Sequence, residues 1–342
     1  MRRSIKSCIA LVIVALPLQV SAALFDNIFL LGDSLSDQGN LFAATASVGG
    51  VANALPSGDH YFNGRFSNGP VYVDLLASAL GVTSTPSIAG GNNFAYGGAR
   101  TTYNTVETTA GGVLPPGLFP WSLNAETAAF SARNIHDPNA LYIVFSGSND
   151  VADIVSRGLN PATVIPTAVS GVLAGVQAFI NAGARLVVVP NLPDLGLIPA
   201  FVGNPAASAA ATALSQQFNS LLHAQLGALS GTDIVEFDTF DFFRDIVNHP
   251  ANFGLTNVST PCYSGFVAPN PAGTVCATPN QYLFWDIVHP TQVVHALLAQ
   301  ELLQVISAAA VPEPSTLALL LLACVVIVLT PAGRRAGSAR AA

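Results

Sequence analysis

Two short segments near opposite ends of the chain contain the residue types of a serine nucleophile and its base. Ser34 follows the apolar run 27–32 in the motif GDSLSD, and a strand-to-helix turn there would present its hydroxyl at the carboxyl edge of a sheet, above a helix N-terminus. Asp286 and His289 lie three residues apart in DIVHP, so the carboxylate can reach Nδ1 while Nε2 faces outward. A nucleophilic serine needs a base, and the base needs a group that fixes its tautomer. Alternatively, Ser34 is a helix N-cap, and Asp286 and His289 are a surface pair or an N-cap.

Two further segments contain groups that can stabilise a developing oxyanion. Asn149, in FSGSND, follows the apolar run 141–145 and can offer its side-chain amide. The run NNFAYGGA ends in Gly97 and Gly98, where a backbone N–H can approach a reacting carbonyl oxygen. The first segment is otherwise an Asn-Asp turn, and the second a flexible glycine turn.

The elements that must position these groups alternate along the chain. Continuous apolar runs are typical of parallel strands that are buried on both faces, and they occur at residues 27–32, 141–145, 185–189 and 234–237. Helical spacing occurs between and after them, at residues 71–80, 161–182, 205–229 and 291–307. This alternation predicts an α/β domain with a doubly wound parallel sheet, whose site lies outside the carboxyl ends of the strands. The Gly-, Asn- and Pro-rich stretches 48–67 and 81–91 are loops that could line the site.

The four segments resemble, in order, the signature blocks of the SGNH hydrolases, also called GDSL lipases or esterases: GDSLSDQGN, NNFAYGGA, GSND and DxxH. The run GRFSNGP followed by VYVDLL further resembles the plant-type lipase branch. The resemblance spans residues 28 to about 305. It implies a three-layer α/β/α, flavodoxin-like fold with a doubly wound parallel sheet of about five strands.

The resemblance also implies a role for each site residue. Ser34 would be the nucleophile, His289 the base and Asp286 the group that orients it. The oxyanion donors would be the Ser34 amide, Asn149 and a glycine of the Gly97–Gly98 pair, which we assign as Gly98. The mechanism it implies uses neither a metal nor an organic cofactor.

Two alternatives come from other classes of protein. One is an inactive hydrolase scaffold that serves as a surface or matrix protein, although no catalytic block departs from the family pattern. The other is a metal-dependent hydrolase in which Asp33, Asp150, Asp286 and His289 bind a cation, since carboxylates and imidazole are plausible ligands.

Composition excludes some classes of protein. Hydrophobic residues make up 51% of the 342 residues, charged residues 9%, and the mean hydropathy is +0.51, which is unlike a disordered chain. The formal net charge is −7, so no basic surface is expected to bind nucleic acid. Residues 24–310 contain 18 of the 19 acidic residues but only six of the 12 Lys and Arg residues. An acidic body between basic, apolar ends is typical of an exported protein.

The N-terminal residues 1–23 have the pattern of a secretory signal: a basic start, an apolar run and a small-residue cleavage site. The apolar run is too short to span the hydrocarbon core of a membrane, although a short anchor is the alternative. The expected hydrolase domain then covers residues 24–310.

The C-terminal residues 311–336 combine VPEPST, an apolar run and an arginine cluster, with residues 337–342 as a short tail. This pattern resembles a PEP-CTERM sorting signal of Gram-negative bacteria, which implies recognition by an exosortase and at least transient contact with the membrane. A simple membrane anchor is the alternative, with the arginines in the cytoplasm. Both place the body outside the cytoplasm, in the periplasm, the outer envelope or the extracellular matrix.

Cys262 and Cys276 are the two cysteines of the body, and they flank a Pro-, Gly- and Asn-rich stretch without histidine. Two lone cysteines cannot make a structural zinc site. An oxidising compartment would allow them to form a disulfide, and closing a loop of about 15 residues contributes roughly 3 kcal/mol.

The expected substrate is a carboxylic ester of a lipid or another acyl group. Phe62, Phe66 and the run 114–121, which ends at Trp121, could supply aromatic walls for an acyl chain or a platform for sugar rings. An O-acetylated polysaccharide of the envelope or matrix is therefore the alternative substrate. Transfer of the acyl group to another alcohol is a third outcome that the sequence leaves open.

Overall fold

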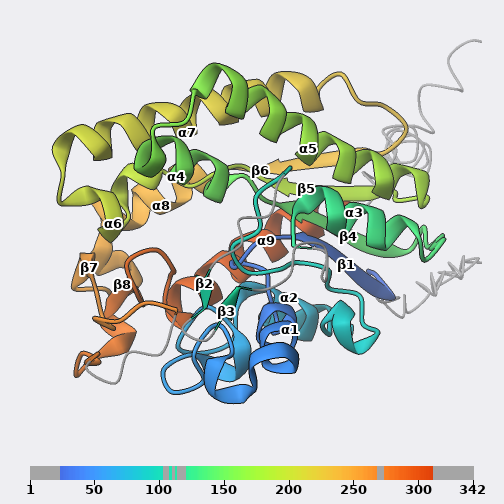
Figure 1. Ribbon diagram of the computed structural model, residues 1–342. Helices are drawn as coiled ribbons and strands as arrows, with labels where there is room; N and C mark the ends of the chain where they lie inside the picture. The colour runs from blue at the N-terminus through green and yellow to red at the C-terminus, as the bar shows by residue number, and fades with distance from the viewer. Residues whose placement is uncertain (1–23, 103–107, 110–111, 114–120, 268–272, 311–342) are drawn as a thin grey trace, which may run out of the picture.

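Four apolar runs form a parallel sheet at the centre of the domain (Figure 1). The computed structural model describes residues 24–102, 108–109, 112–113, 121–267 and 273–310. The strands lie in the order β1-β4-β5-β6, with bounds β1 (Asn27–Gly32), β4 (Ala140–Phe145), β5 (Leu186–Pro190) and β6 (Asp233–Phe237). β1 and β4 pair in full register, from Asn27 opposite Ala140 to Gly32 opposite Phe145.

Alternate residues of the strands enter two separate apolar cores, because successive side chains of a strand point to opposite faces. Leu31, Val144 and Val189 belong to one core, whereas Leu30 and Phe145 belong to the other. Every residue of β4 and β5 is buried, which explains why these strands appear in the sequence as continuous apolar runs rather than as alternating patterns.

Helices cover both faces of the sheet, so the domain has three layers, as the α/β/α prediction requires. On one face lie α3 (Leu123–Ser131), α4 (Ser148–Arg157), α5 (Pro161–Asn181) and α7 (Pro205–Leu226) (Figure 1). On the other lie α2 (Tyr72–Leu80) and α9 (Gln292–Ala310), which pack against each other. By length and composition α5 and α9 could each cross a membrane, but both contact the sheet here.

The segment that follows α2 occupies the fifth position of the sheet, beside β1. Phe94 N–H donates to Leu30 O at 2.9 Å, and Tyr96 N–H donates to Gly32 O at 3.3 Å. Leu30 and Asn93 are the only described residue pair that forms a ladder bridge between the segment and β1, so the segment follows β1 without becoming a regular strand. The spatial order, with this segment first, is that of a flavodoxin-like sheet.

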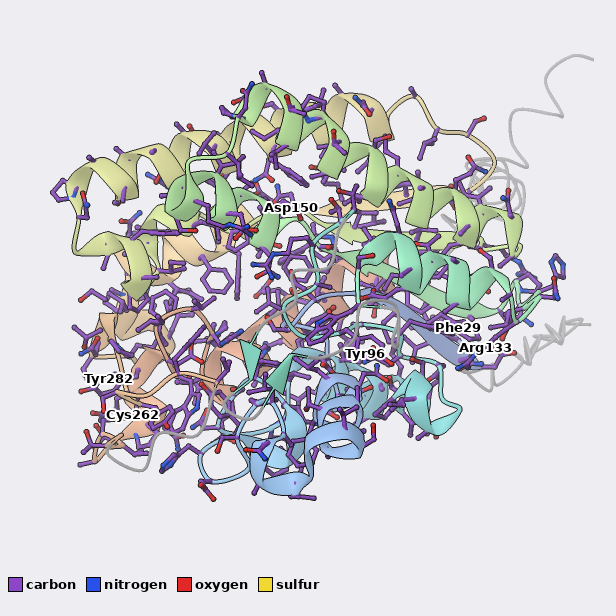
Figure 2. All side chains as sticks on the ribbon, viewed as in Figure 1. Phe29, Tyr96, Arg133, Asp150, Cys262 and Tyr282 are labelled. Atoms are coloured by element: carbon purple, nitrogen blue, oxygen red, sulfur yellow. A yellow bond between two sulfur atoms is a disulfide. The ribbon has the colours of Figure 1, made fainter. Side chains whose placement is uncertain are left out.

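Smaller elements complete the described part of the chain. They are α1 (Asn40–Gly49), α6 (Pro199–Val202) and α8 (Thr239–Asn248), the strand pair β2 (Thr108–Thr109) and β3 (Gly112–Val113), and the pair β7 (Asn257–Pro261) and β8 (Tyr282–Phe284). Cys262 and Cys276 form a disulfide beside β7 and β8, and Figure 2 shows Cys262 and Tyr282 in this region. It closes a loop that begins directly after β7.

One local expectation was wrong: no helix begins beneath Ser34. A single turn follows β1, in which Asp37 N–H donates to Asp33 O at 3.0 Å, and α1 begins only at Asn40. The buried Asp37 side chain accepts hydrogen bonds from the first N–H groups of α1 and so separates the helix from the turn. The segments expected to be a secretory signal, 1–23, a sorting signal, 311–336, and a tail, 337–342, lie outside the described residues.

Candidate active site

The serine, histidine and aspartate are joined by hydrogen bonds at the carboxyl edge of the sheet. His289 Nε2 lies 2.9 Å from Ser34 Oγ, and His289 Nδ1 lies 2.7 Å from Asp286 Oδ2. All three are buried, with 7% of Ser34, 4% of His289 and none of Asp286 exposed. A histidine in this position can accept the serine proton on Nε2 while Nδ1–H remains bound to the carboxylate.

The turn that presents Ser34 depends on a glycine at the end of β1. A Cβ on Gly32 would lie 2.5 Å from Phe145 O, so a side chain there would force β1 and β4 apart. Asp33 then stabilises the turn, because its Oδ1 accepts a hydrogen bond from Leu35 N–H at 3.1 Å.

Asp286 accepts four hydrogen bonds. Val288 N–H and His289 N–H donate to Oδ1 at 2.8 and 2.7 Å, and His289 Nδ1 and the Tyr61 hydroxyl bind Oδ2 at 2.7 and 2.6 Å. Burial opposes the charge of Asp286, but His289 and these donors outweigh it and hold its pKa below the ordinary value. Tyr61 was not anticipated, since it lies in a loop 225 residues before Asp286.

Three potential oxyanion donors surround Ser34. Gly97 N–H donates to Asp37 Oδ2 at 2.8 Å and is therefore occupied, whereas Gly98 N–H has no partner among the described residues. Gly98 has φ 73°, a conformation that favours glycine. Asn149, at the start of α4, donates one amide hydrogen to Ala99 O at 3.0 Å, which leaves the other for a ligand. The Ser34 amide is likewise unbonded within the described residues.

Buried carboxylates hold the loops that contain these donors. Asp37 accepts N–H groups from Gly39, Asn40, Leu41 and Gly97. Glu126, on α3, accepts Gly32 N–H on one oxygen at 2.9 Å and Tyr96 N–H on the other at 3.2 Å, so it joins the end of β1 to the glycine loop. Asp150 accepts the backbone N–H of Thr101 at 3.0 Å and its hydroxyl at 2.9 Å. Tyr96 and Asp150 are labelled in Figure 2.

Burial shifts the pKa of each of these groups upward. It raises the pKa of Asp37 to about 6 and that of Asp150 to about 6, although their hydrogen-bond donors favour the charged forms. The pKa of the fully buried Glu126 is also raised. Asp33 differs, because its Oδ2 has no partner among the described residues, and burial raises its pKa to about 7.

Two apolar cavities meet at Ser34, His289 and Asn149. The first, of about 110 Å³, is lined largely by apolar side chains of the β5–α6 region, α8 and β8: Pro193, Leu195, Ile198, Phe201, Phe243 and Phe284. The second, of about 70 Å³, includes Gly97 and Gly98 and is lined by Leu41, Leu55, Phe66, Phe266 and Val267. Ser34, Asn149 and His289 line both cavities, so a substrate bound at Ser34 can extend in two directions.

The aromatic residues suggested as pocket walls have different positions. Phe66 is buried and lines the second cavity, while 40% of Phe62 is exposed. Trp121 Nε1–H donates to Gly97 O at 2.9 Å, so Trp121 supports the glycine loop rather than forming a wall of either cavity. The rest of the run, residues 114–120, lies outside the described residues.

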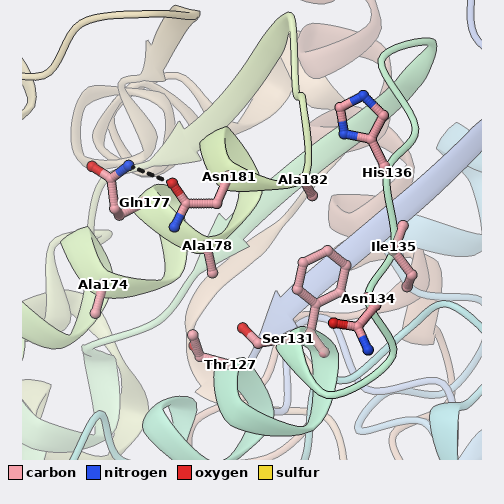
Figure 3. Close-up of a pocket in the computed structure, with 11 residues that line it drawn as sticks. Thr127, Ser131, Asn134, Ile135, His136, Ala174, Gln177, Ala178, Asn181 and Ala182 are labelled. Atoms are coloured by element: carbon pink, nitrogen blue, oxygen red, sulfur yellow. Dashed lines mark hydrogen bonds between the residues drawn. The ribbon is translucent and has the colours of Figure 1, made fainter.

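A larger cavity lies away from these residues, between α3 and α5 (Figure 3). It has a volume of about 630 Å³ and opens widely to solvent. His136 and Asn134 lie on one side of it, and Gln177, hydrogen-bonded to Asn181 at 3.0 Å, lies on the other. It contains none of the groups that surround Ser34, and its lining offers no nucleophile paired with a base.

No group of three or more His, Cys, Asp and Glu side chains in the described residues could hold a metal ion. Asp286 and His289 bind each other and Ser34, and Asp150 is bound by Thr101. The four residues considered above as metal ligands therefore do not form a ligand set.

Comparison with known proteins identifies the family. The profile of the GDSL-like Lipase/Acylhydrolase family matches residues 28–302. The chain belongs to this family. The GDSL protein is 26% identical to the phosphatidylcholine-sterol acyltransferase of Aeromonas hydrophila, over 84% of this chain and 92% of the relative. It is 27% identical to a GDSL esterase/lipase of Arabidopsis thaliana, over 80% of this chain and 86% of the relative.

A third relative is a longer protein. The GDSL protein is 31% identical to esterase EstA of Pseudomonas aeruginosa over 85% of this chain but only 48% of EstA. Family and relatives together identify the GDSL protein as a carboxylic ester hydrolase.

The raised pKa of Asp33 leads to a prediction about how the stability of the protein depends on pH. A carboxyl whose pKa is higher in the folded state than in the unfolded state adds stability that is fully present below pH 4 and is lost as the pH rises through about 7. We expect this group to reduce the free energy of unfolding by about 2 to 3 kcal/mol between pH 5 and pH 8. Urea unfolding at both pH values should show a decrease that is smaller by this amount in Asp33→Asn than in the wild type, where the raised pKa values of Asp37 and Asp150 add to the decrease. The exposed Asp59→Asn is the control, and an identical pH dependence in Asp33→Asn and the wild type would contradict the expectation.

Proposed function

We propose that the GDSL protein is an exported serine esterase or lipase that hydrolyses lipid esters through Ser34, His289 and Asp286. The observation that supports this most directly is the pair of contacts at His289, 2.9 Å to Ser34 Oγ and 2.7 Å to Asp286 Oδ2, at the junction of two apolar cavities. The first cavity has the apolar lining that an acyl chain requires.

The proposed reaction has two steps with a covalent intermediate. Ser34 Oγ attacks the ester carbonyl while His289 Nε2 takes its proton, and Asp286 stabilises the imidazolium that forms. The tetrahedral oxyanion is bound by the Ser34 and Gly98 amides and by the free amide hydrogen of Asn149. His289 then protonates the leaving alcohol, and the acyl group remains on Ser34. Water, activated by His289, hydrolyses this ester and restores Ser34.

The cavities favour a lipid ester over an acetylated polysaccharide. An acetyl group needs only a small pocket, whereas two apolar cavities extend from Ser34. In the proposed complex the acyl chain occupies the first cavity, and the alcohol part extends into the second, beside Phe66. The name of the Aeromonas relative describes acyl transfer between lipids, which agrees with an apolar substrate.

We further propose that residues 24–310 are the hydrolase domain, exported through a cleaved signal at 1–23. The PEP-CTERM-like segment 311–336 would then direct it to exosortase-type sorting machinery at the envelope, with a short tail at 337–342. The Cys262–Cys276 disulfide supports an oxidising location, because such bonds persist outside the cytoplasm.

Replacing the nucleophile tests the proposed function. Ser34→Ala should reduce hydrolysis of p-nitrophenyl esters roughly 10⁴-fold and abolish labelling by a fluorophosphonate, because no acyl-enzyme can form. The measurement is initial rates of the purified full chain, with and without a chelator, together with thermal unfolding to show that the variant is folded. Near-normal hydrolysis by folded Ser34→Ala, or loss of wild-type activity with the chelator, would overturn the proposal.

The oxyanion role of Asn149 predicts a change in turnover rather than in binding. Asn149→Ala should lower kcat about 10²- to 10³-fold and leave KM within a few fold, because the amide binds the oxyanion more tightly than the ground-state carbonyl. Steady-state kinetics on one ester separates the two constants. A raised KM at unchanged kcat would instead identify Asn149 as a substrate-binding or turn residue.

The first cavity predicts the preferred chain length. Ala152 lines it from α4, so Ala152→Phe should fill it and lower activity on decanoate relative to acetate by about tenfold. Rates over a p-nitrophenyl series from acetate to palmitate give this ratio for wild type and variant. An acetate optimum in the wild type would favour the deacetylase alternative, and an unchanged ratio would place the acyl chain elsewhere.

A further inference from the structure

Tyr61 shares one carboxylate oxygen with the proposed base. Its hydroxyl donates to Asp286 Oδ2 at 2.6 Å, and the same oxygen binds His289 Nδ1 at 2.7 Å. Tyr61 is 3% exposed, and burial together with the neighbouring Asp286 raises the pKa of its phenol far above the ordinary range. The phenol therefore remains a hydrogen-bond donor at every pH at which the enzyme is folded.

An aromatic cluster fixes the Tyr61 ring. Tyr263 and Trp285 both meet it edge to face, with ring centroids 5.9 and 6.5 Å away, and Phe66 lies 6.4 Å away. Tyr263 and Trp285 stack on each other at 5.6 Å, and Tyr263 directly follows Cys262 of the disulfide. This packing fixes the ring, and the hydroxyl bonds to Asp286 and also meets the backbone N–H of Val267.

We propose that Tyr61 is a positioning residue of the esterase, which holds Asp286 against His289 and draws part of the carboxylate charge away from the imidazole. The inference rests on the proposed function, since it concerns the proton that His289 takes from Ser34. Two donors on Asp286 Oδ2 divide the charge that a single donor would receive in full. Tyr61 thus limits the share of the Asp286 charge that acts on the His289 ring.

Removing the Tyr61 hydroxyl should move the acid limb of the pH profile in one direction. Without the Tyr61 hydroxyl, the whole charge of Asp286 Oδ2 acts on His289 and favours the protonated ring over the neutral one. The acid limb of the kcat/KM profile, which reports free-enzyme groups, should move upward. The carboxylate also loses one of its two anchors on Oδ2, so turnover should fall while substrate affinity is retained.

Other titratable groups lie near Asp286 and His289, and their own titration must be distinguished from the effect of Tyr61. Asp33 faces His289 from the Ser34 turn, and burial raises its pKa to about 7, within the range of the acid limb. His295 faces it from α9, and burial lowers its pKa to about 3, which keeps it neutral. Tyr263 lies beside Asp286 and Tyr61, and Asp59 faces Tyr263.

The test compares two tyrosines of one cluster. Tyr61→Phe removes the hydroxyl bonded to Asp286, and Tyr263→Phe removes a buried hydroxyl that has no partner among the described residues. Full-length Tyr61→Phe should move the acid limb of kcat/KM upward by roughly 0.5 to 1 pH unit and lower kcat about tenfold with KM within twofold. Tyr263→Phe should leave the limb in place. The same shift should appear when Tyr61→Phe is added to Asp33→Asn.

A second variant keeps the test decisive if Tyr61→Phe does not fold. Site-specific 3-fluorotyrosine at position 61 preserves the ring and is a stronger donor, so it should move the acid limb downward. An unmoved limb in folded Tyr61→Phe, equal shifts in both phenylalanine variants, or loss of the shift in the Asp33→Asn background would overturn the inference. Failure of the proposed function is distinct, because it would appear as activity that survives Ser34→Ala.

Discussion

The site depends on one kind of interaction, the hydrogen bonds by which buried carboxylates hold the backbone N–H groups of its loops. Two of the three proposed oxyanion donors, the Ser34 and Gly98 amides, lie in turns outside the regular strands and helices, and Asn149 lies in the first turn of α4. Asp37, Glu126 and Asp150 each accept hydrogen bonds from a loop near Ser34, and each is at most 1% exposed. Because these carboxylates are buried, breaking such a bond would leave a buried polar group unsatisfied, which costs about 1 to 3 kcal/mol, or more for a charge. The loops that contain the proposed donors are therefore fixed without a substrate.

The same arrangement explains how negative groups can surround a site that is proposed to stabilise an oxyanion. Asp37 binds the N–H of Gly97 and leaves that of Gly98 toward the cavity, so one amide supports the loop and the next can act on the substrate. Asn149 divides its two amide hydrogens in the same way, one to Ala99 O and one to the site. Burial raises the pKa of Asp33, Asp37 and Asp150, so part of their charge is removed at mildly acidic pH.

The sequence patterns predicted the strands whose residues are all buried. They missed residues whose role depends on a partner far away in the sequence. β4 and β5 were predictable because every residue in them is buried. The fifth strand position was not assigned, because the segment at Asn93 is short and forms only one ladder bridge with β1. Tyr61 and Glu126 could not be found, since a loop tyrosine and a helical glutamate indicate exposed positions unless their partners, Asp286 and Gly32, are known to be close.

Ser34 and His289 meet because two helices beneath the serine turn are packed together. Ser36, in that turn, lies 2.8 Å from the Tyr72 hydroxyl at the start of α2, and Tyr72 N–H donates to His295 Nδ1 on α9 at 3.2 Å. Burial lowers the pKa of His295 to about 3, so the ring remains a neutral hydrogen-bond acceptor. The hydrogen bond between α2 and α9 therefore persists into the acid range. His289 lies three residues before Gln292, the first residue of α9, so its position follows that of the helix. The distance between Ser34 and His289, 255 residues apart in sequence, thus depends on the packing of α9 against α2 as well as on the site itself.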